Sequence, residues 1–391
     1  MATRDTTIPD TMFSVTCRGV RDYPLSPSAP VPSPGPGEVL LRVERAGICA
    51  GDAKCYVGAP LFWGDDVRPP YVQPPVIPGH EFAGHIVAVG PGAGRDGDGG
   101  GTGGGRSAGG GGWAVGDRVT AEQVVACGEC LYCRKGLRWL CAPHDIFGFH
   151  TCVPGAMAEY MVLPAKALLH RVPKSLTPKE AVFIEPLSCG AHAVERGNVQ
   201  PGDTVVVSGC GPIGLGMLSV ARTKSPGRLI ALDCSDERLA LARTCGADTV
   251  LNVATLGADA AVAAVRALTN GGYGVDVYLE ASGAGASVAQ GLRMVRKAAT
   301  FVEFSVFAAP VTVDWSVIGD TLELDLLGAH CSGDGGYATA ISLLAGGGVP
   351  AEAIVSHELP LDEVIHGIGL VNGRGGAEAS CKVALDPSLR G

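Results

Sequence analysis

Four cysteines lie close together in the segment ACGECLYCRKGLRWLC, which spans residues 126–141. Thiols at this spacing can pair as disulfides, bind a metal or carry out chemistry. No apolar signal segment opens the chain, so we expect a cytosolic, reducing setting that disfavours a disulfide framework for its 14 cysteines. The spacing favours a closed tetrahedral zinc site, with an iron–sulfur cluster or unliganded thiols as alternatives. The expected ligands are Cys127, Cys130, Cys133 and Cys141.

A second group of residues with metal-binding side chains lies nearer the start of the chain. The segments GICAGD and PGHEFAGH contain Cys49, His80 and Glu81. Thiolate, imidazole and carboxylate groups all bind zinc, and the Pro-Gly turn before His80 would present it together with Glu81. Taken alone, Cys49 is equally well interpreted as a buried thiol, and His80 as a hydrogen-bonded core histidine. Because a zinc closed by four cysteines offers no position to a substrate, any chemistry has to lie outside the cysteine-rich segment.

A glycine-rich turn in VVVSGCGPIG has the spacing G-x-G-x-x-G. It follows a predicted strand and opens a predicted helix, where such glycines let the backbone approach a pyrophosphate. Asp233 ends the next predicted strand, where its carboxylate can accept hydrogen bonds from ribose hydroxyls and repel a 2′-phosphate. We therefore expect NAD; Arg238 could accommodate that phosphate, which leaves NADP as the alternative, and a plain glycine-rich turn is a third interpretation. The turn consists of Gly209, Gly211, Pro212, Ile213 and Gly214.

The elements that must position these residues change in character along the chain. Residues 1–185 contain short β-runs separated by Pro and Gly, which predicts a β-rich domain of compact barrel type. Residues 186–331 alternate strand and helix patterns, which predicts an α/β domain with a doubly wound parallel sheet. Residues 332–391 are expected to return to the first domain. The glycine-rich tract at 90–112 is expected to be a mobile surface loop.

Composition excludes several other classes of protein. A chain of 391 residues with 46% hydrophobic residues fits two globular domains. Its net charge of −9 argues against binding nucleic acid or an anionic membrane surface. The sequence contains no apolar run of about 18 residues, so we expect no membrane span.

Taken in order, these motifs resemble the zinc-dependent medium-chain alcohol dehydrogenases. GICAGD, GHEFAG, the four-cysteine segment, EPLSCGAHAVERG, GCGPIG and ALDCSDERLALA occur in that family's order. The resemblance covers about residues 35–385 except the glycine-rich tract. It implies a GroES-like β-rich catalytic domain, a Rossmann domain, two zinc ions per chain and NAD. It also implies a small alcohol or polyol substrate and a homotetramer or homodimer.

The resemblance also assigns roles to individual residues. Cys49 and His80 become ligands of a catalytic zinc, and Asp52 resembles the carboxylate that orients His80. Glu81 and Glu185 resemble further ligands, either directly or through water. This Cys-His-Glu set with EPLS is most similar to sorbitol, butanediol and related polyol dehydrogenases, and AGDAKCYVGAPLFWGD to erythritol/threitol-type members.

The sequence departs from the family pattern beside the first ligand. Many members start a proton relay with Ser or Thr where this chain has Gly51, and a histidine is common where it has Lys54. Lys54 is either an acid–base partner or hydrogen-bond donor to the substrate, or a solvated lysine. Phe62 and Trp63 are expected to cover the substrate rather than to lie wholly in the core, with packing or a subunit contact as the alternative. Two rival functions are a zinc-independent reductase of the same superfamily and a non-enzymatic zinc-binding module.

Overall fold

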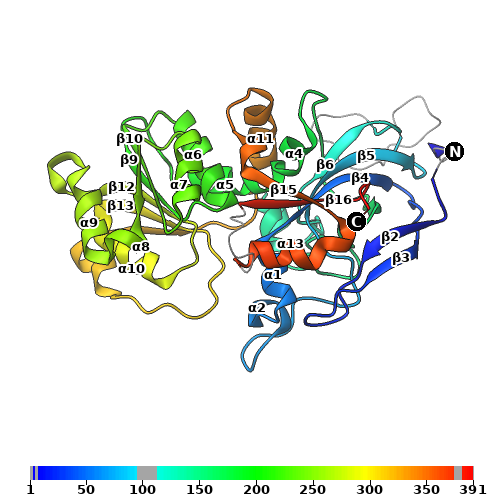
Figure 1. Cartoon of the computed structure of the whole chain (residues 1–391), viewed down its shortest axis with the longest axis horizontal. Helices are drawn as coiled ribbons and strands as arrows, with labels where there is room; N and C mark the ends of the chain where they lie inside the picture. The colour runs from blue at the N-terminus through cyan, green and yellow to red at the C-terminus, as the bar shows by residue number, and fades with distance from the viewer. Residues whose placement is uncertain (1–2, 5–7, 95–111, 374–380, 391) are drawn as a thin grey trace. The chain divides into compact units, whose positions relative to one another are not determined.

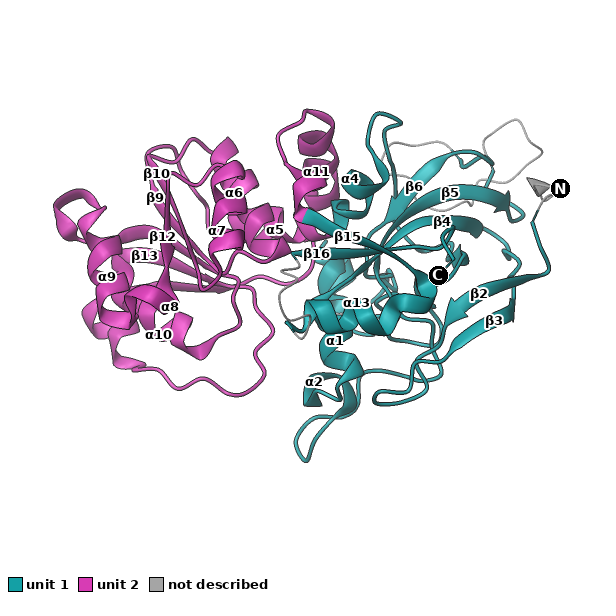
Figure 2. Cartoon of the chain, in the orientation of Figure 1, with its two compact units in different colours: residues 1–185, 355–391 teal, residues 186–354 magenta. Residues whose placement is uncertain are grey.

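The protein is described by a computed structural model over residues 3–4, 8–94, 112–373 and 381–390. These residues form two compact units, the first within 1–185 and 355–391 and the second within 186–354 (Figure 2). Most of the glycine-rich tract that we expected to be a mobile loop, residues 95–111, lies outside the described residues.

The first unit is built on an eight-stranded sheet with a separate two-stranded hairpin (Figure 1). The main path runs β15-β16-β4-β5-β6-β8, with β7 paired to β4 and β1 to β5. The strands are β1 (Thr3–Arg4), β2 (Thr11–Val15), β3 (Leu25–Pro30), β4 (Val39–Ile48), β5 (Glu81–Val89), β6 (Arg118–Ala121), β7 (Tyr160–Leu163), β8 (Leu169–Arg171), β15 (Val355–Pro360) and β16 (Lys382–Asp386). The helices are α1 (Ala50–Tyr56), α2 (Pro60–Trp63), α3 (Leu131–Arg134), α4 (Pro178–Val182) and α13 (Val364–Val371).

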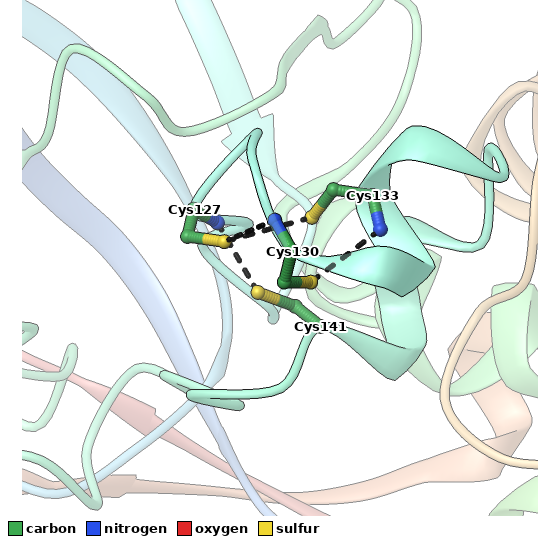
Figure 3. A group of neighbouring side chains, drawn as sticks. All are labelled: Cys127, Cys130, Cys133 and Cys141. Atoms are coloured by element: carbon green, nitrogen blue, oxygen red, sulfur yellow. Dashed lines mark hydrogen bonds between the residues drawn. The ribbon is translucent and has the colours of Figure 1, made fainter.

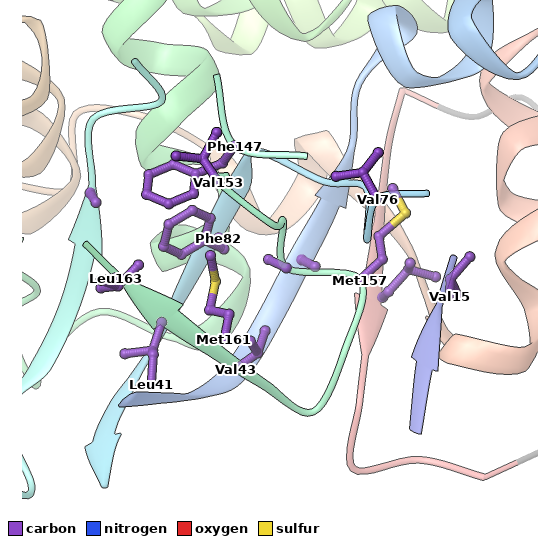
Figure 4. Packing of buried hydrophobic residues seen from close by; sticks show 14 of the residues in the cluster. Val15, Leu41, Val43, Val76, Phe82, Phe147, Val153, Met157, Met161 and Leu163 are labelled. Atoms are coloured by element: carbon purple, nitrogen blue, oxygen red, sulfur yellow. The ribbon is translucent and has the colours of Figure 1, made fainter. Parts of the chain in front are cut away.

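The core of the first unit lies between the strands and the segments that cross them. Phe82 on β5 packs edge-on against Phe147, with ring centroids 5.4 Å apart, and Met157, Met161 and Leu163 extend the same cluster (Figure 4). The nine residues of β5 are almost all buried, as expected for a strand hydrogen-bonded on both sides. This core holds the start of β5 in place, where His80 and Glu81 lie.

The second unit contains a six-stranded parallel sheet in the order β11-β10-β9-β12-β13-β14. Numbered within the unit this is the order 3-2-1-4-5-6 of a dinucleotide-binding sheet, so the predicted doubly wound fold is confirmed. Its strands are β9 (Thr204–Ser208), β10 (Arg228–Asp233), β11 (Thr249–Asn252), β12 (Val275–Glu280), β13 (Val295–Glu303) and β14 (Asp325–Gly328). Its helices are α6 (Pro212–Thr223), α7 (Asp236–Thr244), α8 (Val253–Leu256), α9 (Ala258–Ala267), α10 (Gly285–Met294), α11 (Gly336–Ala345) and α12 (Ala351–Ile354), and α5 (Ile184–Arg196) runs across the boundary at 185.

Two boundaries differ from the sequence-based expectation. The second unit extends to Ile354 rather than to 331, because the segment before α11 packs on α5: a Cβ on Gly333 would meet the ring of His192. The pattern GASVAQGLRMVRKA predicts a helix that continues past Val295, but strand β13 begins at Val295, which pairs with Val275 of β12. Tertiary pairing therefore overrides the helical pattern there.

Candidate active site

Cys49 lies between β4 and α1, at the N-cap of the helix. Its Sγ accepts a hydrogen bond from the Gly51 amide at 3.3 Å, and Asp52 Oδ2 accepts one from the Cys49 amide at 2.9 Å. This reciprocal capping fixes both the thiol and the carboxylate at the start of the helix.

His80 and Glu81 lie at the start of β5, after a turn in which Gly79 has φ +99°. A Cβ on Gly79 would lie 3.0 Å from Met157 Cγ, so only glycine fits the turn comfortably. Both side chains are buried, with 8% of His80 and 2% of Glu81 exposed. One donor atom from each, and one from Cys49, all lie within 4.8 Å of one another. The fold thus brings together the three residues that the sequence suggested as ligands.

Asp52 lies against the histidine, as the resemblance implied. Its Oδ1 is 3.5 Å from His80 Nδ1, and neither atom has a hydrogen-bond partner among the described residues. Burial raises the pKa of Asp52, and the charge of His80 opposes that rise. Burial alone would lower the pKa of His80, but Asp52 and Cys49 together raise it well above its usual value. The acidic surroundings thus favour positive charge at this position, whether on the imidazole or on a cation beside it.

Lys382 completes the surroundings of Glu81, and the sequence analysis did not identify it. It begins β16, and its Nζ pairs with Glu81 Oε2 and donates to the Ile48 carbonyl at 3.0 Å. Burial would lower the pKa of Lys382, but the charges of Glu81 and Cys49 raise it. Gly47 makes room for the pair, because a Cβ there would lie 3.0 Å from Lys382 Cε. The sequence did offer one signal for this residue: Lys382 is a charged residue at the start of the otherwise mostly apolar segment KVALD.

Glu185 and Lys54 lie near these residues but outside the group of three. Glu185, near the start of α5, is 5% exposed, and its charge raises the pKa of both His80 and Lys382. Lys54 is half-buried on α1; burial lowers its pKa, and the charge of Cys49 opposes that effect. Glu185 therefore interacts electrostatically with His80, and Lys54 with Cys49.

The aromatic residues after α1 pack differently from the expectation. Phe62 is 6% exposed and belongs to the core, so the expectation that it is not wholly core is wrong. Its ring stacks on Phe149 at 5.2 Å, and Phe149 in turn lies 5.5 Å from the His80 ring. Trp63 is partly buried, and its Nε1 donates to the Cys55 carbonyl at 2.7 Å. The local Pro and Asp content misled the prediction, because these rings fold back over α1.

The four cysteines of the sequence motif form a separate cluster around α3 and the helical turn Arg138–Leu140. Their sulfur atoms point toward one another (Figure 3), and no disulfide joins them. Backbone amides of the same segment donate to the sulfurs, from Cys127 to Cys141 Sγ at 3.2 Å and from Cys130 to Cys127 Sγ at 3.4 Å. Amides of Ala142 and Cys133 lower the pKa of Cys130 to about 6, whereas burial raises that of Cys141 to about 12.

In the second unit, the glycine-rich turn joins β9 to α6. Gly209 has φ +95°, and a Cβ on Gly214 would collide with the Gly209 carbonyl, so both glycines are needed for the turn itself. Around Gly211 a Cβ would meet no atom within 4 Å. Gly211 is the N-cap of α6 and has no side-chain cap, which leaves amides at a positive helix end open to an anion. Pro212 and Ile213 form the first turn of α6.

Asp233 ends β10 and already organises the loop around it. Its Oδ2 accepts a hydrogen bond from the Cys210 amide at 2.6 Å, and its Oδ1 accepts from the Cys234 and Ser235 amides at 2.7 Å and 2.9 Å. Ser235 caps α7 by accepting from the Arg238 amide at 3.3 Å. The carboxylate is therefore held rigidly beside the glycine-rich turn, with lone pairs left for a ligand.

The two-unit fold and the grouped metal-binding side chains can now be compared with known protein families. Residues 35–174 match the family description "Alcohol dehydrogenase GroES-like domain", and residues 212–346 match "Zinc-binding dehydrogenase". The chain belongs to the zinc-binding, medium-chain alcohol dehydrogenase family. This confirms the predicted resemblance.

Three individual proteins show how similar the chain is to known dehydrogenases. The chain is 47% identical to a protein of Mycolicibacterium smegmatis named "Erythritol/L-threitol dehydrogenase", over 97% of this chain and 99% of the relative. It is 34% identical to an L-threonine 3-dehydrogenase of Pyrococcus horikoshii, over 84% and 86%. A putative zinc-binding dehydrogenase of Sinorhizobium meliloti, solved with NADP bound, matches at TM-score 0.82 and 28% identity, covering 97% of this chain and 100% of that one. Among the described residues, no helix has the length and apolar character to cross a membrane.

Proposed function

We propose that this protein oxidises a secondary hydroxyl group of a small polyol to a ketone and transfers the hydride to NAD. A four-carbon polyol such as erythritol or threitol is the proposed substrate. The observation that carries the proposal is the buried Cys49–His80–Glu81 group. The chain that contains it is 47% identical, over 97% of its length, to the relative named "Erythritol/L-threitol dehydrogenase". The alternatives are 2,3-butanediol, sorbitol and L-threonine.

The buried group fits a zinc ion. It offers one sulfur, one nitrogen and one carboxylate oxygen within 4.8 Å of one another, which is the donor chemistry of a catalytic zinc. We assign Cys49 and His80 as ligands, with Glu81 or Glu185 as the carboxylate ligand, directly or through water. Glu81 is paired with Lys382, so release of Glu81 to the metal would require that ion pair to lengthen. The four-cysteine cluster fits a second, structural zinc.

When bound, zinc lowers the pKa of a coordinated alcohol and the nicotinamide accepts the hydride, so that alcohol and NAD⁺ give ketone, NADH and a proton. We propose that the Asp52 carboxylate, 3.5 Å from His80 Nδ1, orients the His80 ring through its charge. Lys382 neutralises the charge of Glu81 and ties it to the strand end that precedes Cys49. Phe149 covers one face of the His80 ring, and Phe62 stacks behind Phe149, so that we expect water to be excluded from that side of the group. For Lys54 we propose a hydrogen bond to a second substrate hydroxyl or a part in proton transfer.

For the cofactor, we propose that the pyrophosphate lies against the amides at the start of α6, near Gly211. Asp233 would accept hydrogen bonds from the ribose hydroxyls and repel a 2′-phosphate, with Arg238 along the adenine edge. Replacing Asp233 by Ser should weaken NAD use and improve NADP use. Because Asp233 also holds three loop amides, the readout is the ratio of kcat/KM for the two cofactors; a ratio unchanged from that of the unmutated protein contradicts the assignment.

We also propose a cytosolic homodimer or homotetramer. The edge strand β14 and the segment before it leave apolar side chains exposed, with Trp315 71% and Leu326 36% exposed. An uncovered sheet edge of this kind favours pairing with a second copy. Light scattering on the purified protein would give the mass directly, and a monomer at micromolar concentration would reject the proposal.

The deciding experiment is a substrate panel read at the nicotinamide absorbance. Erythritol, threitol, sorbitol, 2,3-butanediol and L-threonine are compared by kcat/KM with NAD and with NADP. We expect the tetritols with NAD to give the highest values; a preference for L-threonine or sorbitol would reassign the substrate while keeping the class. Cys49→Ser should lose turnover and about one zinc per chain, whereas Cys234→Ser, at an exposed thiol, should keep both.

A further inference from the structure

A third group of metal-type donors lies in the first unit, apart from the two proposed zinc sites. Asp145, His150 and Cys152 each offer one donor atom, and these three atoms lie within 4.8 Å of one another. None of them was identified by the sequence analysis, and none has a part in the proposed reaction. We propose that this turn is a third zinc site, with lower affinity and faster exchange than the other two.

The backbone holds these three residues together. Val125 donates to the Asp145 carbonyl at 2.8 Å, which anchors the start of the segment to the preceding chain. Val153 donates to the His150 carbonyl at 3.0 Å, and Gly148 donates to the Val153 carbonyl at 2.9 Å. These two hydrogen bonds close residues 148–153 into a turn. The donors are therefore preorganised, and binding an ion costs little additional ordering of the chain.

The three side chains lie partly buried and partly open to solvent. The His150 side chain is only 7% exposed, and its Nδ1 is hydrogen-bonded to Asp145 Oδ1 at 2.8 Å, a contact that a bound ion would replace. Tyr71 packs on the imidazole with ring centroids 4.6 Å apart, which further limits its orientation. Cys152 is exposed, so an ion can enter and leave from the solvent side.

The chemistry of the donors selects the ion. A thiolate together with an imidazole favours zinc over magnesium or calcium, which prefer oxygen ligands alone. Three protein ligands leave at least one position for water, so the affinity should be lower than that of the four-cysteine cluster.

The turn is joined to the segment that carries His80. Gly155 donates to the Ile77 carbonyl at 2.7 Å, and Ala156 to the Gly79 carbonyl at 3.0 Å. Phe149, next to His150 in the chain, packs on the His80 ring at 5.5 Å. An ion bound at 145–152 would therefore restrain a ring that covers the proposed active site, and stabilise the unit as a whole.

The test compares full-length proteins equilibrated by dialysis against buffered free Zn²⁺, with bound zinc counted per chain. The unmutated protein should bind about one zinc more than Cys152→Ser, and Asp145→Asn should match Cys152→Ser. Cys234→Ser, which removes the other exposed thiol of the described residues, should bind as much as the unmutated protein. Because the result is a difference between variants, it does not depend on the proposed dehydrogenase activity.

A second readout identifies the ligand itself. Co²⁺ added to protein that holds zinc at the two tighter sites only should produce a thiolate-to-metal absorption band that Cys152→Ser abolishes and Cys234→Ser retains. Added Zn²⁺ should raise Tm in the unmutated protein and not in Cys152→Ser. Equal zinc content in the unmutated protein and Cys152→Ser would overturn the proposal, as would a cobalt band that survives in Cys152→Ser.

Discussion

The four-cysteine cluster and the Cys49–His80–Glu81 group are assembled in opposite ways. In the cluster, all donors come from one short segment, and Cys127 and Cys141 are 14 residues apart. The buried group depends on separate elements, and the Lys382–Ile48 contact beside it joins residues 334 apart. The cluster is held by local amide-to-sulfur hydrogen bonds, and the buried group by strand pairing and burial. A site encoded locally should therefore fail locally, whereas a site built by the fold should fail together with the fold.

The largest expected effect comes from Lys382→Met. It leaves the Glu81 carboxylate buried without its partner, which should lower the free energy of unfolding by about 3–5 kcal/mol. Urea denaturation measures the loss. The matched control is Lys179→Met: Lys179 pairs with Glu358 at 3.5 Å, but their side chains are 25% and 27% exposed, so the cost should stay below about 1 kcal/mol. Equal costs for the two lysines would show that the buried group is not held by this pair.

Next in size is Cys130→Ser in the cluster. We expect about one zinc per chain to be lost and Tm to fall, because the short segment would lose the structural zinc that we propose for it. The kcat/KM of the molecules that remain folded should be close to that of the unmutated protein. A stable variant with no turnover would contradict a purely structural role for the cluster.

A smaller effect is expected from Gly79→Ala, which strains the turn before His80. The positive φ and the close approach to Met157 should together cost about 1–3 kcal/mol. Gly116→Ala provides the control, since Gly116 has φ +91° but a Cβ there would meet nothing within 4 Å. Thermal unfolding of both variants separates crowding from backbone strain; if Gly116→Ala loses as much stability, crowding by Met157 contributes nothing.

The smallest effect is expected from Gly51→Ser. A Cβ at this position would lie 3.6 Å from Cys49 Sγ and 3.7 Å from Phe62 Cζ, which are ordinary contacts. Stability should change by less than about 0.5 kcal/mol, so the hydroxyl common in the family can be restored without disturbing the fold. A large loss of stability or zinc in this variant would mean that the ligand loop is tighter than these contacts indicate.

The same contrast explains what the sequence could predict. The four cysteines were identified from their spacing, and the glycine-rich turn from its spacing together with the predicted strand before it and helix after it, because both geometries are set within a short stretch of chain. The parallel sheet followed from alternating strand and helix patterns, and the GroES-like domain from family resemblance. Lys382 was missed because nothing near it in the chain indicates Glu81; the contact results from the β16–β4 register, in which Val383 pairs with Ile48. Phe62 was misjudged for the same reason, since Phe149 supplies its packing from a distant segment.

The position of Lys382 on β16 has a consequence for biosynthesis. Ribosomes add about 5–20 residues per second, so the 14 residues from Cys127 to Cys141 take about one to three seconds. The 334 residues from Ile48 to Lys382 take about 17 to 67 seconds. Until Lys382 is added, Glu81 lacks the lysine that pairs with it, and the sheet between β4 and β15 lacks the strand that joins them. In a nascent chain the four-cysteine cluster, with the zinc that we propose for it, can thus form early, but a chain released before β16 emerges would carry the cluster without a completed Cys49–His80–Glu81 group.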